Sequence, residues 1–181
     1  MPFFGPHDMS RFMSELGATT DGLKLAFTAL LTMRGVPLVY DGDEIAIPGG
    51  GDPDNHRDIP GGRTSHPRNA FAACGLTSER QDVWSHVNTW LKARASHADL
   101  RRGTMKHLVV ADQQLLYRRG AVFVATDNDI KSADVLSPVV INGRDVLQRG
   151  SAQMGRALTI LQCSSYVLKP ATRQRDGATA R

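Results

Sequence analysis

The chain has 181 residues, of which 41% are hydrophobic and 22% charged, a composition typical of a folded, soluble protein with one ordinary domain or two small ones. The formal net charge is +4, and the arginine-rich last eleven residues supply part of it, so no basic face emerges and nucleic-acid binding is disfavoured. No apolar run is long enough to cross a membrane, and the start of the chain lacks the pattern of a signal peptide.

The first predicted element is a helix over residues 19–34, because apolar side chains recur there at the spacing of one helix face. These side chains are Leu23, Ala26, Phe27, Leu30 and Leu31. Thr20 or Asp21 is the expected N-terminal cap, and Gly35 suits the C-terminal end. Residues 36–40 (VPLVY) are then predicted to form a short parallel strand buried on both faces, with a buried helical turn as the competing interpretation.

A long loop follows from residue 42 to residue 69, rich in glycine and aspartate and containing four prolines. A loop of this length inside a compact domain is usually functional or disordered, and its varied charged residues favour a functional loop. It does not match a calcium-binding EF-hand, because His56 and Arg57 occupy positions where an oxygen ligand and a glycine are needed. Nor does its glycine run have the Lys-Ser/Thr of a phosphate loop.

A second helix is predicted from residues 78–81 (SERQ), which have the form of a capping box, to about residues 101–103. Its apolar face is expected to bury both tryptophans, Trp84 and Trp90, in the core. Cys74 and Cys163 lie far apart without metal-ligand spacing, and we interpret them as buried or incidental thiols.

After Gly103 the apolar period changes from that of a helix to that of a strand. Short β-prone runs are predicted at residues 105–110, 114–118, 121–126, 139–142, 145–148, 156–161 and 165–169. Asn142-Gly143 predicts a tight hairpin turn, and the set of runs predicts a small antiparallel β-sandwich. Residues 171–181 are expected to be a disordered tail.

Two segments of the chain resemble motifs of the alpha-amylase family, glycoside hydrolase family 13. Residues 35–55 (GVPLVYDGDEIAIPGGGDPDN) are similar to the family's eighth barrel strand and the loop after it, although Asp41 replaces the usual second tyrosine. Phe4 to Asp8 (FGPHD) resembles the family's fourth conserved region at the end of strand seven. A complete (β/α)₈ barrel needs about 250 residues, so the resemblance implies the C-terminal portion of such an enzyme.

The fold implied is mixed, α/β plus all-β. Residues 1–102 would be an incomplete TIM-barrel remnant, and residues 103–170 the β-sandwich domain that follows the barrel in this family. No cofactor is expected, although calcium is possible in a full-length parent. The partner expected is an α-glucan or maltooligosaccharide, with no nucleic acid and no membrane; the sequence carries no signal for the oligomeric state.

The resemblance also assigns site residues. Asp8 matches the aspartate that stabilises the transition state, and His7 the histidine that binds a sugar hydroxyl. Asp52, His56, Arg57 and Tyr40 are the expected substrate-binding residues, with His56 standing where the family run D-P-D-N-R-R has arginine. Retaining glycosidases need a nucleophilic carboxylate and an acid. The family's nucleophilic Asp and acid Glu have no counterpart here, so the isolated chain is expected to be inactive.

Other interpretations are less favoured. The chain could supply its own carboxyl pair from Asp43 and Glu44, or from Asp52 and Asp54, but nothing marks any of them as the acid. It could be a non-catalytic carbohydrate-binding or interaction module built on the sandwich. Against that, the aromatic residues in 103–170 are few: Tyr117, Phe123 and Tyr166. A truncated gene product with no function of its own is the third possibility.

Overall fold

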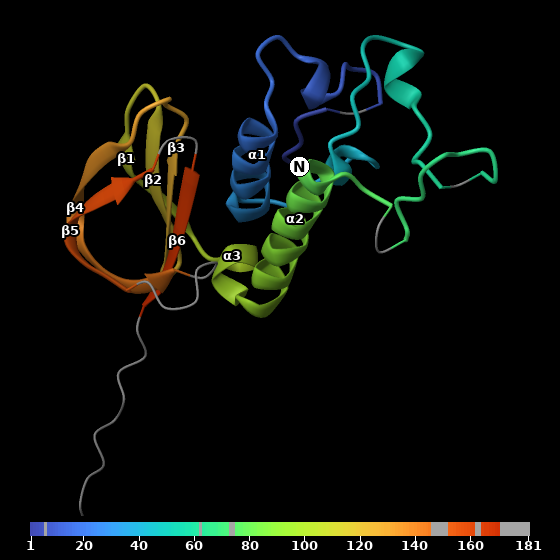
Figure 1. Cartoon of the computed structure of the whole chain (residues 1–181). Helices are drawn as coiled ribbons and strands as arrows, with labels where there is room; N and C mark the ends of the chain where they lie inside the picture. Colours follow the sequence, from blue (N-terminus) through green and yellow to red (C-terminus); the bar gives the residue numbers. More distant parts are fainter. Residues whose placement is uncertain (6, 62, 73–74, 146–151, 162–163, 171–181) are drawn as a thin grey trace, which may run out of the picture.

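The computed structural model describes residues 1–5, 7–61, 63–72, 75–145, 152–161 and 164–170. Figure 1 shows a helical part with long loops beside a curled sheet. The predictions made for Cys74, Cys163 and the tail 171–181 lie outside the described residues. None of the described helices has the length and apolar character needed to span a membrane.

Helix α1 covers Thr20–Thr32 and confirms the first predicted helix. Its buried side includes Leu23, Phe27 and Leu31, each fully shielded from solvent. The predicted caps Thr20 and Asp21 were wrong, because Thr19 is the cap and its side chain accepts a hydrogen bond from the Gly22 N–H at 3.0 Å. Thr19 has extended backbone angles, which turn its hydroxyl toward the free N–H groups of the first turn.

Helix α2 covers Ser78–Ser96, and a separate short helix α3 covers Ala98–Arg102. The cap of α2 is Thr77, one residue before the predicted capping box. Trp90 is fully buried as predicted, but Trp84 is 42% exposed, so its predicted place in the core was wrong. The buried face of α2 contains Val83, Val87 and Trp90, and Trp84 lies about 100° around the helix from Val83.

The segment 36–40 is not a strand in this structure, and Val36 is 71% exposed. The predicted buried parallel strand was therefore wrong for the described residues. One backbone hydrogen bond, from the Leu38 N–H to the Pro2 carbonyl at 3.0 Å, is the start of a pairing between the two segments. A parallel strand needs a ladder of such bonds, and here residue 2 supplies a single acceptor.

Six strands form one antiparallel sheet with the order β1-β2-β3-β6-β4-β5. They are β1 Met105–Val110, β2 Gln114–Arg119, β3 Val122–Asp127, β4 Ala133–Asp145, β5 Ala152–Ile160 and β6 Ser164–Pro170. The sheet curls so that β1 and β2 contact β4. Most of the predicted runs are confirmed as strands, since their alternating apolar pattern is a local signal.

The predicted hairpin at Asn142-Gly143 was wrong, because both residues lie inside the long strand β4. Asn142 pairs with Met154 and Gly143 with Gln153 on β5, so the ladder runs straight through them. Of the strand predicted at 145–148, only Asp145 lies within the described residues, and it is the last residue of β4 rather than part of a separate strand.

The sheet buries apolar side chains on both faces. On one face Tyr117, Val124 and Val167 pack with the buried residues of α1 and α2. On the other, Leu116, Phe123 and Leu168 join a second core enclosed by the curled sheet. Strand β3 lies between the two cores, which explains why all six of its residues are buried. The helical part and the sheet therefore share one of the two hydrophobic cores.

Candidate functional site

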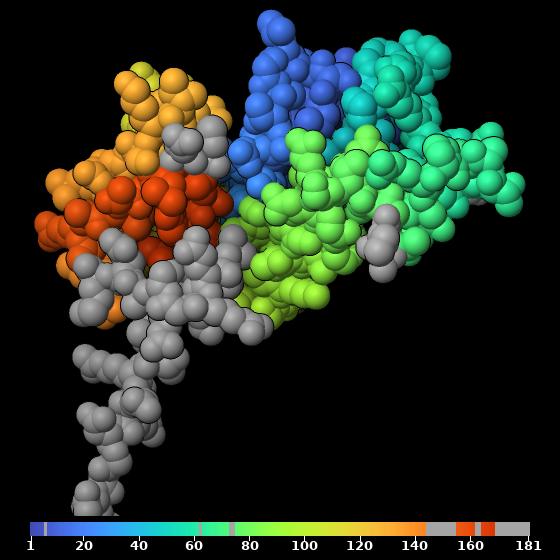
Figure 2. All heavy atoms as spheres, in the orientation of Figure 1, coloured from blue at the N-terminus to red at the C-terminus, as the bar shows by residue number. Residues whose placement is uncertain are grey.

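The site predicted from sequence lies in the helical part, where the start of the chain meets the loop after residue 40. Figure 2 shows this loop (teal to green) at the surface, at the end of the molecule farthest from the sheet. Asn55 joins the two segments, because its buried side-chain amide donates hydrogen bonds to the carbonyls of His7 and Met9. As a result the rings of His7 and His56 lie 6.1 Å apart between centroids.

Arg11 is the second link between the two segments, and it is almost fully buried. Its guanidinium donates to the carbonyl of Asn55 at 2.8 Å, to the carbonyl of Asp41 at 2.7 Å and to Asp43 Oδ1 at 3.1 Å. It also lies over the Tyr40 ring, 4.3 Å from the centroid. One side chain therefore holds the backbone on both sides of the predicted binding residues.

The carboxyl of Asp43 is buried beside this guanidinium. Burial raises the pKa of Asp43 to about 6, and the positive charge of Arg11 offsets only part of that rise. Sequence reasoning missed both roles. The available signal was weak: Arg11 is the first Lys or Arg in the chain and stands between a predicted site residue and a helix.

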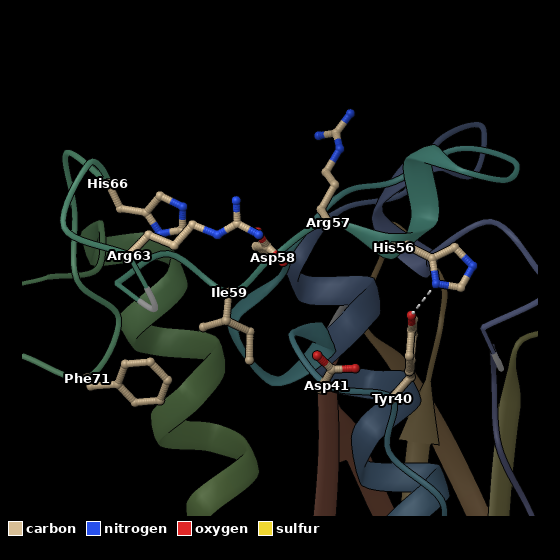
Figure 3. A pocket seen from close by; sticks show the side chains of 9 residues that line it. All are labelled: Tyr40, Asp41, His56, Arg57, Asp58, Ile59, Arg63, His66 and Phe71. Carbon is tan, nitrogen blue, oxygen red and sulfur yellow. Dashed lines mark hydrogen bonds and ion pairs between the residues drawn. The ribbon is translucent and has the colours of Figure 1, made fainter.

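Two imidazole–carboxylate pairs make up the exposed part of the site. His7 Nε2 lies 3.2 Å from Asp8 Oδ1, and His56 Nε2 lies 3.4 Å from Asp52 Oδ1. The other ring nitrogen of His56 lies 3.5 Å from the Tyr40 hydroxyl (Figure 3). Exposed ion pairs are weak, so these carboxylates and rings can exchange their present contacts for ligand hydroxyl groups.

Arg57 is the predicted binding residue that the structure leaves out of this group. Its guanidinium binds Asp54 through two nitrogens at 2.7–2.9 Å, and in Figure 3 it points away from Tyr40 and His56. The Gly50 N–H and then Arg57 lower the pKa of Asp54. Five of the six predicted site residues are thus neighbours, and Arg57 serves the loop itself.

The carboxyl pairs considered from sequence are not free in the structure. Asp43 is buried against Arg11, and Glu44 Oε2 accepts the Gly42 N–H at 2.8 Å. Asp52 contacts His56, while Asp54 contacts Arg57. No cluster of three or more His, Cys, Asp or Glu side chains suited to a metal ion occurs within the described ranges.

The sheet offers little as a sugar-binding surface. Tyr117 is fully buried, Phe123 is 9% exposed, and Tyr166 is partly buried against the second core. Sugar-binding modules present aromatic faces to the ligand, and these three rings are used for packing instead. The alternative of a carbohydrate-binding module on the sheet therefore has no support from its aromatic residues.

A pocket of about 330 Å³ adjoins the predicted site. Its lining includes three of the predicted binding residues, Tyr40, His56 and Arg57 (Figure 3). The other lining residues are Asp41, Asp58, Ile59, Arg63, His66 and Phe71. From the sequence, Asp58 was considered only as a calcium ligand and rejected, and His66 and Phe71 were given no role. For His66 and Phe71 the available signal was the length of the loop that carries them.

Comparison with known proteins gives consistent matches. The family model described as alpha amylase, catalytic domain, matches residues 1–115. A cyclomaltodextrinase from a Bacillus species is 29% identical over 129 residues, which cover 68% of this chain and 21% of that relative. A cyclomaltodextrinase from Thermoanaerobacter pseudethanolicus is 25% identical over 91% of this chain and 27% of its own length. The match thus spans only 21–27% of the length of these relatives.

Solved structures show the same likeness. The alpha-amylase of Geobacillus thermoleovorans, in complex with acarbose, superposes with a TM-score of 0.76 and 24% identity over 95% of this chain and 39% of that one. An Anoxybacillus alpha-amylase superposes with a TM-score of 0.72 and 25% identity, covering 95% of this chain and 38% of that one. The likeness includes the sheet as well as the helical part, because it covers nearly the whole chain.

Proposed function

The chain belongs to the alpha-amylase family through its match to the catalytic domain, and on that premise we propose that it is the C-terminal portion of an α-glucan-active glycosidase. In this proposal residues 1–102 are the last part of a (β/α)₈ barrel, and residues 103–170 are the β-sandwich domain that follows it. The curled antiparallel sheet, and the superposition of 95% of this chain on 39% of an alpha-amylase, support this division.

The observation that carries the proposal is the meeting of two distant segments. His7 and Asp8 lie beside Tyr40, Asp52 and His56 because Arg11 and Asn55 hold the two segments together. We assign Asp8 the role of stabilising the transition state and His7 that of binding a sugar hydroxyl. Tyr40, Asp52 and His56 would contact the same oligosaccharide, with Arg57 supporting the loop.

The reaction proposed for the parent enzyme is retaining hydrolysis or transfer at α-glucosidic bonds. That chemistry needs a carboxylate nucleophile and a carboxylic acid about 5 Å apart, and it needs no cofactor. The motifs that supply these two groups in the family are not in this sequence. We therefore propose that the isolated chain binds maltooligosaccharides but does not cleave them.

Two assays test the proposal together. Incubation with maltoheptaose should release no reducing sugar, whereas calorimetric titration should detect binding. Asp8→Ala should weaken that binding about tenfold, the size expected for losing one hydrogen bond to a charged group. Asp112→Ala, at an exposed turn between β1 and β2, is the control and should bind like the parent. If the chain cleaves maltoheptaose and Asp8→Ala abolishes that cleavage, the proposed inactivity is contradicted. If Asp8→Ala binds maltoheptaose as tightly as the parent, the role assigned to Asp8 is contradicted.

A further inference from the structure

Helices α1 and α2 lie side by side and meet along a seam of polar side chains (Figure 1). Successive members are four residues apart on α1 and three or four apart on α2, so each helix presents them on one face. Three pairs cross the seam: Thr20 with Glu79 at 3.0 Å, Lys24 with Asp82 at 2.7 Å, and Thr28 with His86 at 3.0 Å. The first two pairs are exposed, whereas Thr28 is fully buried. The pair of Thr28 and His86 is therefore the innermost contact of the seam.

One nitrogen of His86 has three polar neighbours. The Trp90 indole N–H donates to Nε2 at 3.1 Å, the Thr28 hydroxyl lies 3.0 Å from it, and the Lys24 carbonyl lies 2.9 Å from it. An indole N–H can only donate, so its bond requires Nε2 without a proton. The Thr28 hydroxyl accepts from Ser165 of β6 at 3.1 Å and has its own proton to donate. A neutral ring with its proton on Nδ1 therefore suits both the indole and the hydroxyl.

Protonation reverses the role of this nitrogen. A proton on Nε2 makes it a donor to the Lys24 carbonyl or to the Thr28 oxygen, and the Trp90 indole then faces another N–H group. Within the part of the chain that the structure describes, no other group accepts from this indole. Trp90 is fully buried, so its N–H would lose a hydrogen bond without gaining one to water.

The charges around His86 come from the two helices. On α1, the Lys24 ammonium lies 2.8 Å from Asp21 and 2.7 Å from Asp82 of α2, and Glu79 lies one pair further out. Strand β6 reaches this point through an uncharged serine hydroxyl. Burial lowers the pKa of His86, the hydrogen bond to the Lys24 carbonyl opposes that change, and the charges of Lys24 and Asp82 act in opposite directions. The neutral ring is thus the form that the folded protein favours at neutral pH.

From this arrangement we infer that His86 is a pH-sensitive contact between α1 and α2, which the neutral ring closes and which protonation of Nε2 opens. The protonated ring leaves the Trp90 indole without an acceptor and places a positive charge in a partly buried position. Both costs fall when the ring turns toward solvent, and that movement breaks its hydrogen bonds to α1. The two outer pairs contain no imidazole, so the opening is confined to the inner end of the seam. This inference concerns the fold and does not depend on the proposed sugar chemistry.

The test is an NMR titration of the full chain from about pH 8 to about pH 5. The Trp90 indole N–H signal should shift in one step that coincides with titration of the His86 ring nitrogens, at a midpoint below the ordinary 6.5. Below that midpoint the indole proton should exchange with water about tenfold faster than the change in pH alone produces, as expected for losing one buried hydrogen bond. Trp84 on the same helix is 42% exposed, and its indole signal is the internal reference without such a step.

Two histidine variants identify the titrating group. His86→Gln offers an amide oxygen to the indole but does not titrate, so the step should disappear. His107→Gln removes an exposed histidine of β1 and should leave the step unchanged. A parent chain without the step, or a step that persists in His86→Gln, would overturn the inference.

A tryptophan pair tests the role given to the indole. Trp90→Phe removes the donor, so His86 should bind its proton about tenfold more tightly than in the parent. Trp84→Phe, at an exposed position of the same helix, should leave the titration of His86 unchanged. If Trp90→Phe also leaves it unchanged, the indole does not oppose protonation and the proposed contact is wrong.

Discussion

The buried Arg11–Asp43 pair allows a prediction whose sign depends on pH. The folded protein holds the pKa of Asp43 at about 6, against an ordinary value of 3.8. Because the pKa is higher in the folded state, the protonated form of Asp43 stabilises the folded protein. This contribution to stability is fully present below pH 3.8 and is lost as pH rises through 6. At 1.36 kcal/mol per unit, the two-unit difference makes this loss about 3 kcal/mol. Water screens the interactions of this carboxyl only weakly, because the Asp43 side chain is 4% exposed.

Asp43→Asn removes this titration while keeping the shape of the side chain. The free energy of unfolding of the parent, relative to the variant, should therefore fall by about 2 kcal/mol between pH 4 and pH 7, because part of the loss already occurs below pH 4. Urea unfolding followed by tryptophan fluorescence measures this difference, since Trp90 is fully buried in α2. Asp112→Asn serves as the exposed control and should show a flat difference. A parent that instead gains stability over Asp43→Asn as pH rises would refute the reasoning, because the attraction to Arg11 would then outweigh burial.

The remaining predictions concern stability. Arg119→Met should lower the free energy of unfolding in urea by about 3 kcal/mol or more, because the buried guanidinium donates to three backbone carbonyls at the ends of α1 and α3. Arg118→Met, on the exposed side of β2, is the control and should lower it little. Thr77→Ala should lower the free energy of unfolding by about 1 kcal/mol, because it removes the cap of α2, and Ser78→Ala should lower it much less. Equal losses in the two variants would contradict the observed cap. Burial lowers the pKa of His86, so the parent should lose stability relative to His86→Gln as pH falls below about 6.5, measured by urea unfolding at each pH.

The elements best predicted from sequence are those with a local signal. The apolar spacing around Leu23 and Phe27 predicted α1, and the alternation after Gly103 predicted most of the sheet. These patterns predict secondary structure because one face of a helix or strand must be buried against a hydrophobic core, whichever residues form that core. The caps at Thr19 and Thr77 were each missed by one residue, since several neighbouring residues had suitable side chains and only the backbone angles selected one.

The elements that were predicted wrongly depend on neighbours. Residues 36–40 have the composition of a buried strand, but a strand exists only where other strands pair with it, and Pro2 supplies one hydrogen bond. Trp84 was predicted to be in the core because it is apolar and near the buried face of α2, yet its side chain is 42% exposed and lines a surface pocket with residues of the preceding loop. Asn142-Gly143 is a strong turn signal that the ladder with β5 overrides.

For the candidate site, the sequence by itself determined the family and the two segments that carry the candidate binding residues, because a short motif can be recognised from its residue types alone. Tertiary structure decided which groups meet: Arg11 with Asp43, 32 residues away, and Asn55 with the His7 carbonyl, 48 residues away. Such contacts have no period and no fixed spacing, since their partners are brought together by the path of the whole chain. Only the folded arrangement could therefore show that a buried arginine and a buried asparagine hold the site in place.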